Sequence, residues 1–298
     1  MKIAVLARKG GQYTHTRIRQ AAHARGHSIE IVNALRCHLA ITDDGLSVHH
    51  EGRPMAGFDA VIPLLNPATA EHGMTILRQF EMMGVFSLNR SAGVACARNK
   101  LHCLQVLAGN GVAVPATAFA HQRDKAEDMI RLTGGAPTVI KVPEGRQGIG
   151  VALADSARSA RSVIEAFAAV KQKVMTQEFI AEAGGTDIRV VVIGGKVFAA
   201  MKRSGQPGDF RSNLHRGGMP EAVDISTQES AMAIKATQAV GLNVCGVDIL
   251  RSRRGSLVIE VNSTPGLEGI ESVSGKDIAG AIIGFLEAQL RPTSAAAA

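Results

Sequence analysis

The order of apolar runs in the first 95 residues constrains the fold of this chain more than any other feature. Lys2 to Ala7 predicts a strand, Thr14 to Arg25 predicts a helix, and Ile29 to Val32 predicts a second strand. Phe58 to Leu65 predicts a further buried strand, and the apolar face of residues 71–83 predicts a helix after it. This strand–helix–strand order is typical of an α/β domain with a parallel sheet.

The pattern changes further along the chain, where strands follow one another through tight turns. Ile188 to Ile193 and Lys196 to Met201 are separated by Gly194-Gly195, which is the signature of a two-residue hairpin. A second hairpin is predicted to pair Gly246 to Leu250 with Leu257 to Val261. Antiparallel sheets are therefore expected in the later part of the chain, in an α+β arrangement.

A length of 298 residues predicts about two domains, at roughly 150 residues per domain. We expect an N-terminal α/β domain at 1–95 and an α+β domain at 96–290, with a central subdomain at about 112–180 and a C-terminal subdomain at about 181–290. Residues 291–298 are predicted to form a disordered tail. The remaining predicted elements are a helix at Ala92–Gly109, strands at Val139–Val142 and Val174–Ile180, and helices at Ala157–Val170 and Thr227–Val240.

Composition excludes several classes of function. Aromatic residues make up 3% of the chain and Trp is absent, which argues against the stacking platforms of single-stranded nucleic-acid binders and against base-specific recognition. The net charge is +7, and +5 of it lies in residues 1–100, with 12 basic and 7 acidic side chains. This surplus suits an anionic partner and makes the N-terminal third the expected docking surface.

The cysteines and the N-terminus indicate a cytoplasmic protein. No C-x-x-C pair occurs, so neither a zinc site nor a disulfide framework is predicted for Cys37, Cys96, Cys103 and Cys245. The apolar run from Ile3 to Ala7 is too short for a signal peptide. The longest uncharged stretch, Cys103 to Gln122, is interrupted by polar residues, glycines and a proline, so no membrane span is expected.

One glycine-rich segment is a candidate phosphate loop. Lys141 lies on the predicted strand Val139–Val142, and Glu144 to Gly150 follows with three glycines whose backbone N–H groups can surround an anion. The segment is not a Walker A loop, and an ordinary hairpin turn is the alternative. Gln177 to Ile180 places a polar residue beside apolar ones, which suits an adenine ring, although an edge strand would look the same. Arg8 to Gln12 lacks the G-x-G-x-x-G spacing, so a nicotinamide oxidoreductase is disfavoured.

The second hairpin carries the strongest constellation of acidic residues. If its turn centres on Arg254, Asp248 faces Glu260 directly, and Asn262 lies on the same face because residues two apart on a strand share a side. Two facing carboxylates need a cation between them, and oxygen donors of this kind suit Mg²⁺ with phosphates completing its shell. The alternative is that Arg251 or Arg254 neutralises a solvated acidic pair.

A basic cluster follows the first hairpin around Gly217-Gly218. Its members are Lys202, Arg203, Arg211, Asn213, His215 and Arg216. Arginine side chains match phosphate and carboxylate in two-point contacts, so the cluster could hold an acyl phosphate as it forms, while a solvated loop is the alternative. No Ser-His-Asp or Cys-His order indicates a covalent hydrolase.

Taken together, these motifs resemble the ATP-grasp superfamily and, closely, the RimK family, which attaches glutamate to the C-terminus of the sixth small-subunit ribosomal protein. The resemblance runs from Met1 to about Leu290. It is carried by Arg78–Met82, Gly134–Pro137, Val139–Lys141, Glu144-Gly145, Gln147–Val151, Asp209–Gly218, Gly246–Arg251, Glu260–Asn262 and Pro265–Glu271.

The resemblance implies ATP bound between two antiparallel sheets and two Mg²⁺ or Mn²⁺ ions. It implies metal binding by Asp248, Glu260 and Asn262, and a catalytic role for Lys141 on phosphate and Arg203 as a transition-state cation. The nucleotide contacts that it implies are Lys100, Lys141, Gln147, Gly148, Ile149, Gly150, Glu178 and Phe179 at adenine, Asp187 on ribose, Arg211, Ser212 and Asn213.

The resemblance also implies L-glutamate as a substrate, a ribosomal protein tail as the acceptor, free poly-glutamate as a second product, and a homo-oligomer. Leu64, Asn99, Arg146 and Thr264 depart from the pattern of the family. Two alternatives remain open at this point. One is a ligase that adds an amino acid to a small metabolite or coenzyme, and the other is an ATP-responsive, ribosome-binding module without ligase activity.

Overall fold

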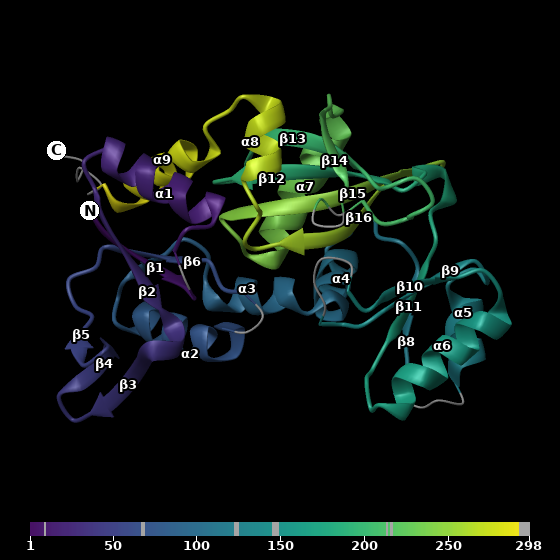
Figure 1. The fold of residues 1–298 in the computed structure, drawn as a ribbon, viewed down its shortest axis with the longest axis horizontal. Coiled ribbons are helices and arrows are strands. Elements are labelled where there is room, and N and C mark those ends of the chain that lie inside the picture. Colours follow the sequence, from purple (N-terminus) through teal and green to yellow (C-terminus); the bar gives the residue numbers. More distant parts are fainter. Residues whose placement is uncertain are drawn as a thin grey trace, which may run out of the picture.

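The computed structural model describes residues 1–8, 10–66, 69–121, 125–144, 149–212, 214 and 217–291. Among these residues the strands form one parallel sheet, one small antiparallel sheet beside it, and two larger antiparallel sheets. Figure 1 shows the N-terminal sheet at one end of the molecule, the teal four-stranded sheet at the other, and the green five-stranded sheet between them. Both expected sheet types, parallel first and antiparallel afterwards, are confirmed.

The N-terminal sheet has the strand order β2-β1-β6-β7, and all of its pairs are parallel. Its strands and helices are β1 (Lys2–Ala7), α1 (Tyr13–Ala24), β2 (Ser28–Asn33), β6 (Ala60–Pro63), α2 (Ala70–Met82) and β7 (Phe86–Ser87). Ile3 to Ala7 are all buried, because helices cover both faces of a parallel sheet. That double burial explains why β1 appears in the sequence as a continuous apolar run.

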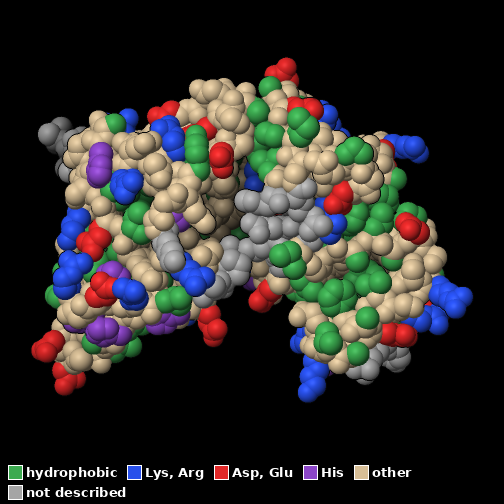
Figure 2. Space-filling view, in the orientation of Figure 1, with side chains coloured by type: hydrophobic (Ala, Val, Ile, Leu, Met, Phe, Trp, Pro, Cys, Tyr) green, Lys and Arg blue, Asp and Glu red, His purple; other side chains and the backbone are tan. Residues whose placement is uncertain are grey.

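A small antiparallel sheet that the sequence did not predict lies beside this domain. It contains β3 (Cys37–Thr42), β4 (Gly45–His50) and β5 (Arg53–Pro54), after the short 3-10 helix η1 (Ala34–Arg36). Gln79 of α2 holds it, since its side-chain Nε2 donates to the carbonyls of Ala40 at 3.1 Å and Ser47 at 3.3 Å. Most histidines visible in Figure 2 lie on the half of the molecule that carries this sheet.

The connection between the domains is two helices where the sequence predicted one. They are α3 (Ser91–Arg98) and α4 (Lys100–Gly109). Asn99 breaks the predicted helix because its backbone is extended, and its side chain caps α4 by accepting a hydrogen bond from the His102 amide at 2.9 Å. The expectation of a single helix from Ala92 to Gly109 was therefore wrong, for a local reason.

The central sheet has the order β10-β9-β11-β8 and is antiparallel throughout. Its elements are β8 (Thr117–Phe119), α5 (Ala126–Leu132), β9 (Thr138–Lys141), β10 (Val151–Ala154), α6 (Ala157–Ala169) and β11 (Met175–Glu178). Ile140 packs into a buried cluster with residues of α5 and α6. Because side chains alternate along a strand, Val139 and Lys141 must point to the opposite face, which helices leave open.

The five-stranded sheet has the order β14-β13-β12-β15-β16. Its elements, with the short 3-10 helix η4 (Ala181–Ala183) before them, are β12 (Thr186–Ile193), β13 (Lys196–Ser204), β14 (Met219–Ala222), α7 (Thr227–Val240), β15 (Val244–Ser252) and β16 (Gly255–Asn262). Ile188, Val190 and Val192 face the core cluster that contains α7 residues. The other face begins with Asp187 and Arg189 and ends with apolar residues that pack against the N-terminal domain.

The chain returns to the N-terminal domain at its end, through α8 (Glu268–Ser274) and α9 (Ile278–Leu290). Figure 1 shows α9 beside α1, at the end of the molecule that carries the N-terminus. Buried Glu271 joins the two parts, because it accepts hydrogen bonds from Tyr13 and Arg17 of α1 and from the first amides of α9.

The packing of the C-terminal helices against α1 reduces the excess of positive charge around the N-terminal domain. Arg17 pairs with Glu271, and Arg25 pairs with Glu287, so acidic groups from the end of the chain lie against basic groups from its beginning. Figure 2 shows acidic and basic side chains interspersed over that half of the molecule. Counting charge by position in the sequence therefore overstates the local excess.

The four cysteines are all free and buried. Burial raises the pKa of the Cys37 thiol to about 11 and that of the Cys245 thiol to about 12. In the part of the chain that the structure describes, no helix has the length and apolar character needed to cross a membrane.

Candidate active site

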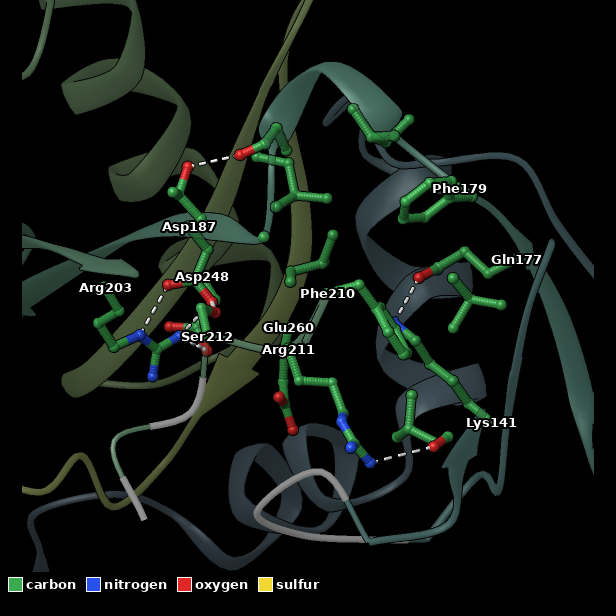
Figure 3. A pocket seen from close by; sticks show the side chains of 18 of the residues that line it. Lys141, Gln177, Phe179, Asp187, Arg203, Phe210, Arg211, Ser212, Asp248 and Glu260 are labelled. Atoms are coloured by element: carbon green, nitrogen blue, oxygen red, sulfur yellow. Dashed lines mark hydrogen bonds and ion pairs between the residues drawn. The ribbon is translucent and has the colours of Figure 1, made fainter. Parts of the chain in front are cut away.

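A row of charged side chains crosses the open face of the five-stranded sheet. Asp187 and Arg189 share one face of β12, because they are two residues apart. Arg203 of β13 lies opposite Asp187, Asp248 of β15 lies opposite Arg189, and Glu260 of β16 lies opposite Asp248. These five residues form what we call the charged row, and Figure 3 shows four of them at one side of the cavity described below.

The members of the charged row pair closely with one another. Arg203 Nε donates to Asp187 Oδ1 at 2.6 Å, and its Nη2 lies 2.9 Å from Asp248 Oδ2. Arg189 holds the same Asp248 carboxylate in a two-point contact of 2.8 and 2.7 Å. Ser212 adds a hydroxyl donor to Asp187. Asp187, Arg189, Arg203 and Asp248 therefore form a largely buried network in which each charge has an opposite neighbour, as burial requires. Glu260 is the exception in the row, because its neighbour there is Asp248 and its counter-ion is Lys100.

The network separates the pKa values of its two aspartates. Burial works against ionisation of Asp248, but Arg189 and Arg203 together hold its pKa down to about 2. Burial raises the pKa of Asp187, because only Arg203 and a hydroxyl compensate for the lost water. Asp248 is thus a carboxylate at any physiological pH, and both of its oxygens accept hydrogen bonds from Arg189.

The hairpin that carries the acidic residues contains the predicted pair of Asp248 and Glu260, but its register differs from the predicted one. Its turn pairs Ser252 with Gly255, and this register alone would place Ile259 opposite Asp248. A bulge between Asp248 and Ile249 shifts the register by one residue, so that Asp248 faces Glu260 as predicted. The turn is therefore not centred on Arg254, although the pairing inferred from that centre is correct.

The cations that neutralise Asp248 and Glu260 are not Arg251 or Arg254, the two arginines considered from the sequence. Arg251 pairs with Glu229, and Arg254 pairs with Glu178, so neither neutralises the Asp248–Glu260 pair. The neutralising groups are Arg189 and Arg203 at Asp248, and Lys100 of α4, whose Nζ lies 3.3 Å from Glu260 Oε1.

The oxygen donors fit a hard divalent cation. Asn262 Nδ2 lies 3.2 Å from Asp248 Oδ2, and Glu260 lies opposite Asp248, so two carboxylates and one amide meet at the end of the hairpin. The described residues contain no group of three or more His, Cys, Asp or Glu side chains arranged for a metal. A metal here would take its remaining ligands from elsewhere, as Mg²⁺ does when it shares its shell with phosphate oxygens.

The central sheet presents Lys141, a partly buried lysine, to the charged row. Lys141 Nζ donates to Gln177 Oε1 at 2.6 Å, and Gln177 Nε2 donates to Thr117 Oγ1 at 3.0 Å, so three strands hold the ammonium group in place. Burial lowers the pKa of Lys141 from 10.5 to about 8, while the Glu260 carboxylate partly opposes this change. Lys141 remains mainly protonated at neutral pH and is poised to receive an anion.

Between the two sheets lies a cavity with about 900 Å³ of empty space, including its open mouth. Lys141 and Gln177 line it from one sheet, and Asp187, Asp248 and Glu260 line it from the other (Figure 3). Among the expected site residues that the structure describes, the lining also includes Lys100, Ile149, Glu178, Phe179, Arg203, Arg211 and Ser212. The cavity thus gathers cations, carboxylates and apolar rings in one place.

Two aromatic rings form the apolar end of this cavity. Phe179 follows β11, and Phe210 lies on the loop after β13, with ring centroids 6.2 Å apart in an edge-to-face arrangement. Arg211 lies over the Phe210 ring at 5.6 Å and reaches the carbonyl of Val151 in the other sheet at 3.5 Å. The loop after β13, which carries Phe210 and Arg211, therefore covers the cavity from the side of the five-stranded sheet.

Glu178 takes a different position from the other expected nucleotide residues. Its carboxylate pairs with Arg254 and accepts a hydrogen bond from the Ala116 amide at 3.1 Å, and Arg254 lowers its pKa. The side chain thereby ties the end of β11 to the turn of the second hairpin. In this structure Glu178 braces the two sheets against each other while it lines the cavity.

Some expected residues lie outside the described residues or away from the cavity. Gln147, Gly148, Asn213, His215 and Arg216 fall outside the described residues, as do Arg146 and residues 292–298 of the expected tail. Gly150 is described, and its carbonyl accepts a hydrogen bond from the Val142 amide at 3.0 Å. Lys202 does not join Arg203, since it lies on the opposite face of β13 and pairs with Glu221.

The chain matches two protein-family descriptions that together account for nearly all of it. Residues 97–286 match the RimK-like ATP-grasp domain, and residues 1–94 match the RimK PreATP-grasp domain. The chain belongs to the RimK family of ATP-grasp proteins. It is accordingly an ATP-dependent ligase, and its two antiparallel sheets are those of the ATP-grasp fold.

Curated relatives of this RimK-family protein match it over almost their whole length. A protein of Thioalkalivibrio sulfidiphilus, named "Probable alpha-L-glutamate ligase", is 51% identical over 292 residues, which is 98% of this chain and 97% of the relative. A protein of Azotobacter vinelandii with the same name is 52% identical over 287 residues, 96% of this chain and 95% of the relative.

Solved structures show the same fold at lower identity. The ATP-grasp ligase PsnB, complexed with a minimal precursor, matches with a TM-score of 0.76 and 23% identity over 97% of this chain and 98% of its own. A RimK domain ATP-grasp protein from Sphaerobacter thermophilus matches with a TM-score of 0.74 and 21% identity over 96% and 99% of the two chains.

Three of the four departures from the family pattern lie among the described residues and have structural roles. Asn99 caps α4, a role that Asn and Asp share. The Thr264 hydroxyl donates to the Pro63 carbonyl at 3.2 Å, as a serine hydroxyl could. Leu64 packs against the buried cluster between the N-terminal domain and the five-stranded sheet.

Sequence reasoning missed Arg189, Phe210 and the role of Gln177. Arg189 follows Asp187 by two residues, so the Asp-x-Arg spacing on a strand was a usable signal for a shared face. The partner of Arg189 could not be found this way, because β12 and β15 are far apart in sequence and no hairpin joins them. The sequence suggests Gln177 as an adenine contact; in the structure Gln177 lines the cavity, and its side chain also holds Lys141.

Proposed function

We propose that this RimK-family ligase attaches L-glutamate to a protein carboxylate, namely the C-terminus of the sixth small-subunit ribosomal protein. The names of relatives at 51% and 52% identity support glutamate as the amino acid. The observation that carries the proposal is the cavity in which Lys141 of one sheet faces the charged row of the other. The ribosomal acceptor follows from the family resemblance, and a basic chain of net charge +7 suits an acidic tail that lengthens as glutamates are added.

The nucleotide is proposed to lie in the cavity with its base at the aromatic end. Phe179 and Phe210 would contact adenine, and the phosphates would extend toward Lys141 and Lys100. Asp187 is assigned to the ribose, and Arg211 and Ser212 to further nucleotide contacts. Lys141 suits the phosphate because burial strengthens the attraction between opposite charges.

The proposed reaction has two steps that balance. The acceptor carboxylate attacks the γ-phosphorus of ATP, an acyl phosphate forms, and ADP leaves. The amine of glutamate then attacks the acyl carbon, inorganic phosphate leaves, and the nitrogen gives up a proton as the amide forms. Lys141 and Arg203 offset the negative charge that gathers on the transferred phosphoryl group.

Asp248, Glu260 and Asn262 are proposed to bind two divalent ions, which are either Mg²⁺ or Mn²⁺. When bound, the metal would neutralise phosphate charge and draw the phosphoryl oxygens into a fixed arrangement. Arg189 and Arg203 keep Asp248 ionised, which preserves it as a ligand. The proposal also includes closure of the glycine-rich segment at 144–150 over the nucleotide, which would exclude water that otherwise hydrolyses an acyl phosphate, and residues 145–148 of that segment lie outside the described residues.

The proposal includes the wider organisation expected from the sequence. It assigns residues 1–95 to a pre-ATP-grasp domain and 96–290 to the ATP-grasp domain, whose subdomains meet near residue 180. It also places the enzyme in the cytoplasm as a homo-oligomer.

Intact mass spectrometry tests the proposal. Purified small-subunit ribosomal proteins would be incubated with the protein, Mg²⁺, ATP and L-glutamate. We expect a ladder of glutamyl increments on one protein, together with ADP. ADP release that depends on glutamate but leaves every ribosomal protein unchanged would reject the ribosomal acceptor and favour free poly-glutamate synthesis or a small acceptor. Absence of ADP under all conditions would reject the ligase reaction itself.

A further inference from the structure

Asn89 is a buried side chain that joins the N-terminal domain to the hairpin carrying the acidic residues. Its Nδ2 donates to the carbonyls of Val244 at 2.7 Å and Ser263 at 3.0 Å. Its Oδ1 accepts from the amides of Asn243 at 2.9 Å and Val244 at 3.0 Å. Asn89 is 1% exposed, so these four hydrogen bonds replace all of the water that its amide would otherwise bind.

The N-terminal domain holds Asn89 from both sides along the chain. The Leu88 amide extends the pairing of β7 by donating to the Val61 carbonyl at 2.9 Å, and the Ser87 hydroxyl donates to the Asn89 carbonyl at 2.6 Å. Just after it, Glu81 of α2 accepts hydrogen bonds from the amide and hydroxyl of Ser91 at 2.6 and 2.7 Å. The position of Asn89 is thus set by the sheet and helices of the first domain.

The contacts of Asn89 lie at the open end of the β15–β16 hairpin. Val244 begins β15, and Ser263 directly follows Asn262, the last residue of β16. The last paired residues at this end are Gly246 and Asn262, so no ladder hydrogen bond beyond them sets the separation of the two strands. The Asn89 amide bridges that gap by bonding to one carbonyl on each side.

We propose that Asn89 is a positioning residue that holds Asn262 and the facing carboxylates at the spacing the divalent cation needs. This inference rests on the proposed metal role of Asp248, Glu260 and Asn262. Asn89 touches none of them and acts through the backbone of Val244 and Ser263. The N-terminal domain thereby contributes to metal binding in the second domain.

The chemistry of the contact requires a primary amide of this length. Two donors and two acceptor lone pairs are used, and an aspartate would lose both donors while facing two carbonyl oxygens. Alanine would leave two carbonyls and two amides without this partner, of which the carbonyl and amide of Val244 are buried, and the hairpin end would be free to spread. Groups that orient metal ligands without touching the metal commonly change metal affinity by roughly 10–100-fold when removed.

The test measures ADP binding by calorimetry with and without Mg²⁺, in the full-length protein. Asn89→Ala is the test variant. The matched control is Asn243→Ala, which removes a hydrogen bond in the same interface, from Asn243 Nδ2 to the Leu88 carbonyl at 2.8 Å, without loosening the hairpin end. We expect Asn89→Ala to bind metal-free ADP as the unsubstituted protein does and to require about tenfold more Mg²⁺ for the same gain in ADP affinity.

The outcomes separate this inference from the proposed function. If the unsubstituted protein gains no ADP affinity from Mg²⁺, the proposed metal site fails. If it does gain affinity and Asn89→Ala gains equally, the positioning role fails. The positioning role also fails if Asn243→Ala loses the gain as fully as Asn89→Ala. Should Asn89→Ala not fold, Asn89→Ser replaces it, because its hydroxyl keeps one contact but cannot bond to both strands.

Discussion

The low pKa of Lys141 makes nucleotide affinity depend on pH in a direction that can be worked out. In the free protein burial lowers this pKa to about 8, and a bound phosphate would move it back toward 10.5. Since one pKa unit corresponds to roughly 1.4 kcal/mol, a full return couples protonation to binding by about 3 kcal/mol. Below pH 8 the lysine is already charged and affinity is constant. Above pH 8 binding must take up a proton, so affinity falls about tenfold per pH unit.

The assay is calorimetric titration with ADP between pH 7.5 and pH 9.5. Its phosphates are fully ionised over that range, so their own titration does not contribute. We expect affinity at pH 9 to be about tenfold weaker than at pH 7.5, with uptake of close to one proton at pH 9, measured in buffers of different ionisation enthalpy. Lys141→Arg is the control, because a guanidinium stays charged and should give a flat profile with no proton uptake.

A flat profile in the unsubstituted protein would refute the reasoning, because it would mean that Lys141 is either fully charged throughout or not in contact with the nucleotide. A slope retained by Lys141→Arg would assign the titration to another group.

Three further predictions concern the lysine, its hydrogen-bond acceptor and one glycine. Between pH 8 and 10.5 the unfolded chain carries more protons at Lys141 than the folded protein, so stability against urea should rise with pH in that window, and Lys141→Met should remove the rise. Gln177→Leu deletes the acceptor at 2.6 Å from Lys141 Nζ and should weaken ADP binding by about tenfold, while equal affinity in both proteins would show that Gln177 does not orient the lysine. Gly185 and Gly195 both have positive φ, at +72° and +74°, but only at Gly185 would a Cβ lie 2.8 Å from the Asp209 carbonyl oxygen. In urea unfolding, Gly185→Ala should therefore lower stability by about 1–3 kcal/mol more than Gly195→Ala does. Equal losses would contradict the close approach of Asp209 to Gly185.

The sequence predicted the parts of the fold that depend on local pattern. β1 and α1 formed where periodicity placed them, and the Gly194-Gly195 turn joins Ile193 to Lys196 as expected, because both glycines adopt the positive φ that this two-residue turn requires. The β3–β5 sheet was missed because β3 and β4, although as long as β1, carry three histidines between them and have no apolar run longer than Leu39–Ile41.

The candidate site was predicted where its residues share one hairpin or one motif. Asp248 and Glu260 were paired correctly, although the register of the turn alone gives Asp248 a different partner. The bulge that restores the predicted pair has no sequence signal that we could identify. Contacts between strands that no hairpin connects stayed out of reach. The pairing of Arg189 with Asp248 depends on β12 lying beside β15, and the hold of Gln177 on Lys141 depends on β11 lying beside β9.

Helix α4 shows the same limit at a smaller scale. Asn99 interrupts a helical pattern and caps α4. The consequence of this break depends on residues distant in the sequence, because the Lys100 side chain lies beside Glu260 and the Pro143 carbonyl accepts a hydrogen bond from the Lys100 amide at 3.0 Å. The break turns α4 so that its first residue reaches the charged row.

The most direct test of the central claim is ADP release by the unsubstituted protein and by the double variant Asp248→Asn/Glu260→Gln. Each would be incubated with Mg²⁺, ATP, L-glutamate and purified ribosomal proteins, with reactions lacking glutamate or the ribosomal proteins run in parallel. We predict ADP release that needs both glutamate and acceptor in the unsubstituted protein, and none in the double variant, whose circular dichroism spectrum should be unchanged. Equal ADP release by the two proteins, or release that needs neither glutamate nor acceptor, would contradict the account.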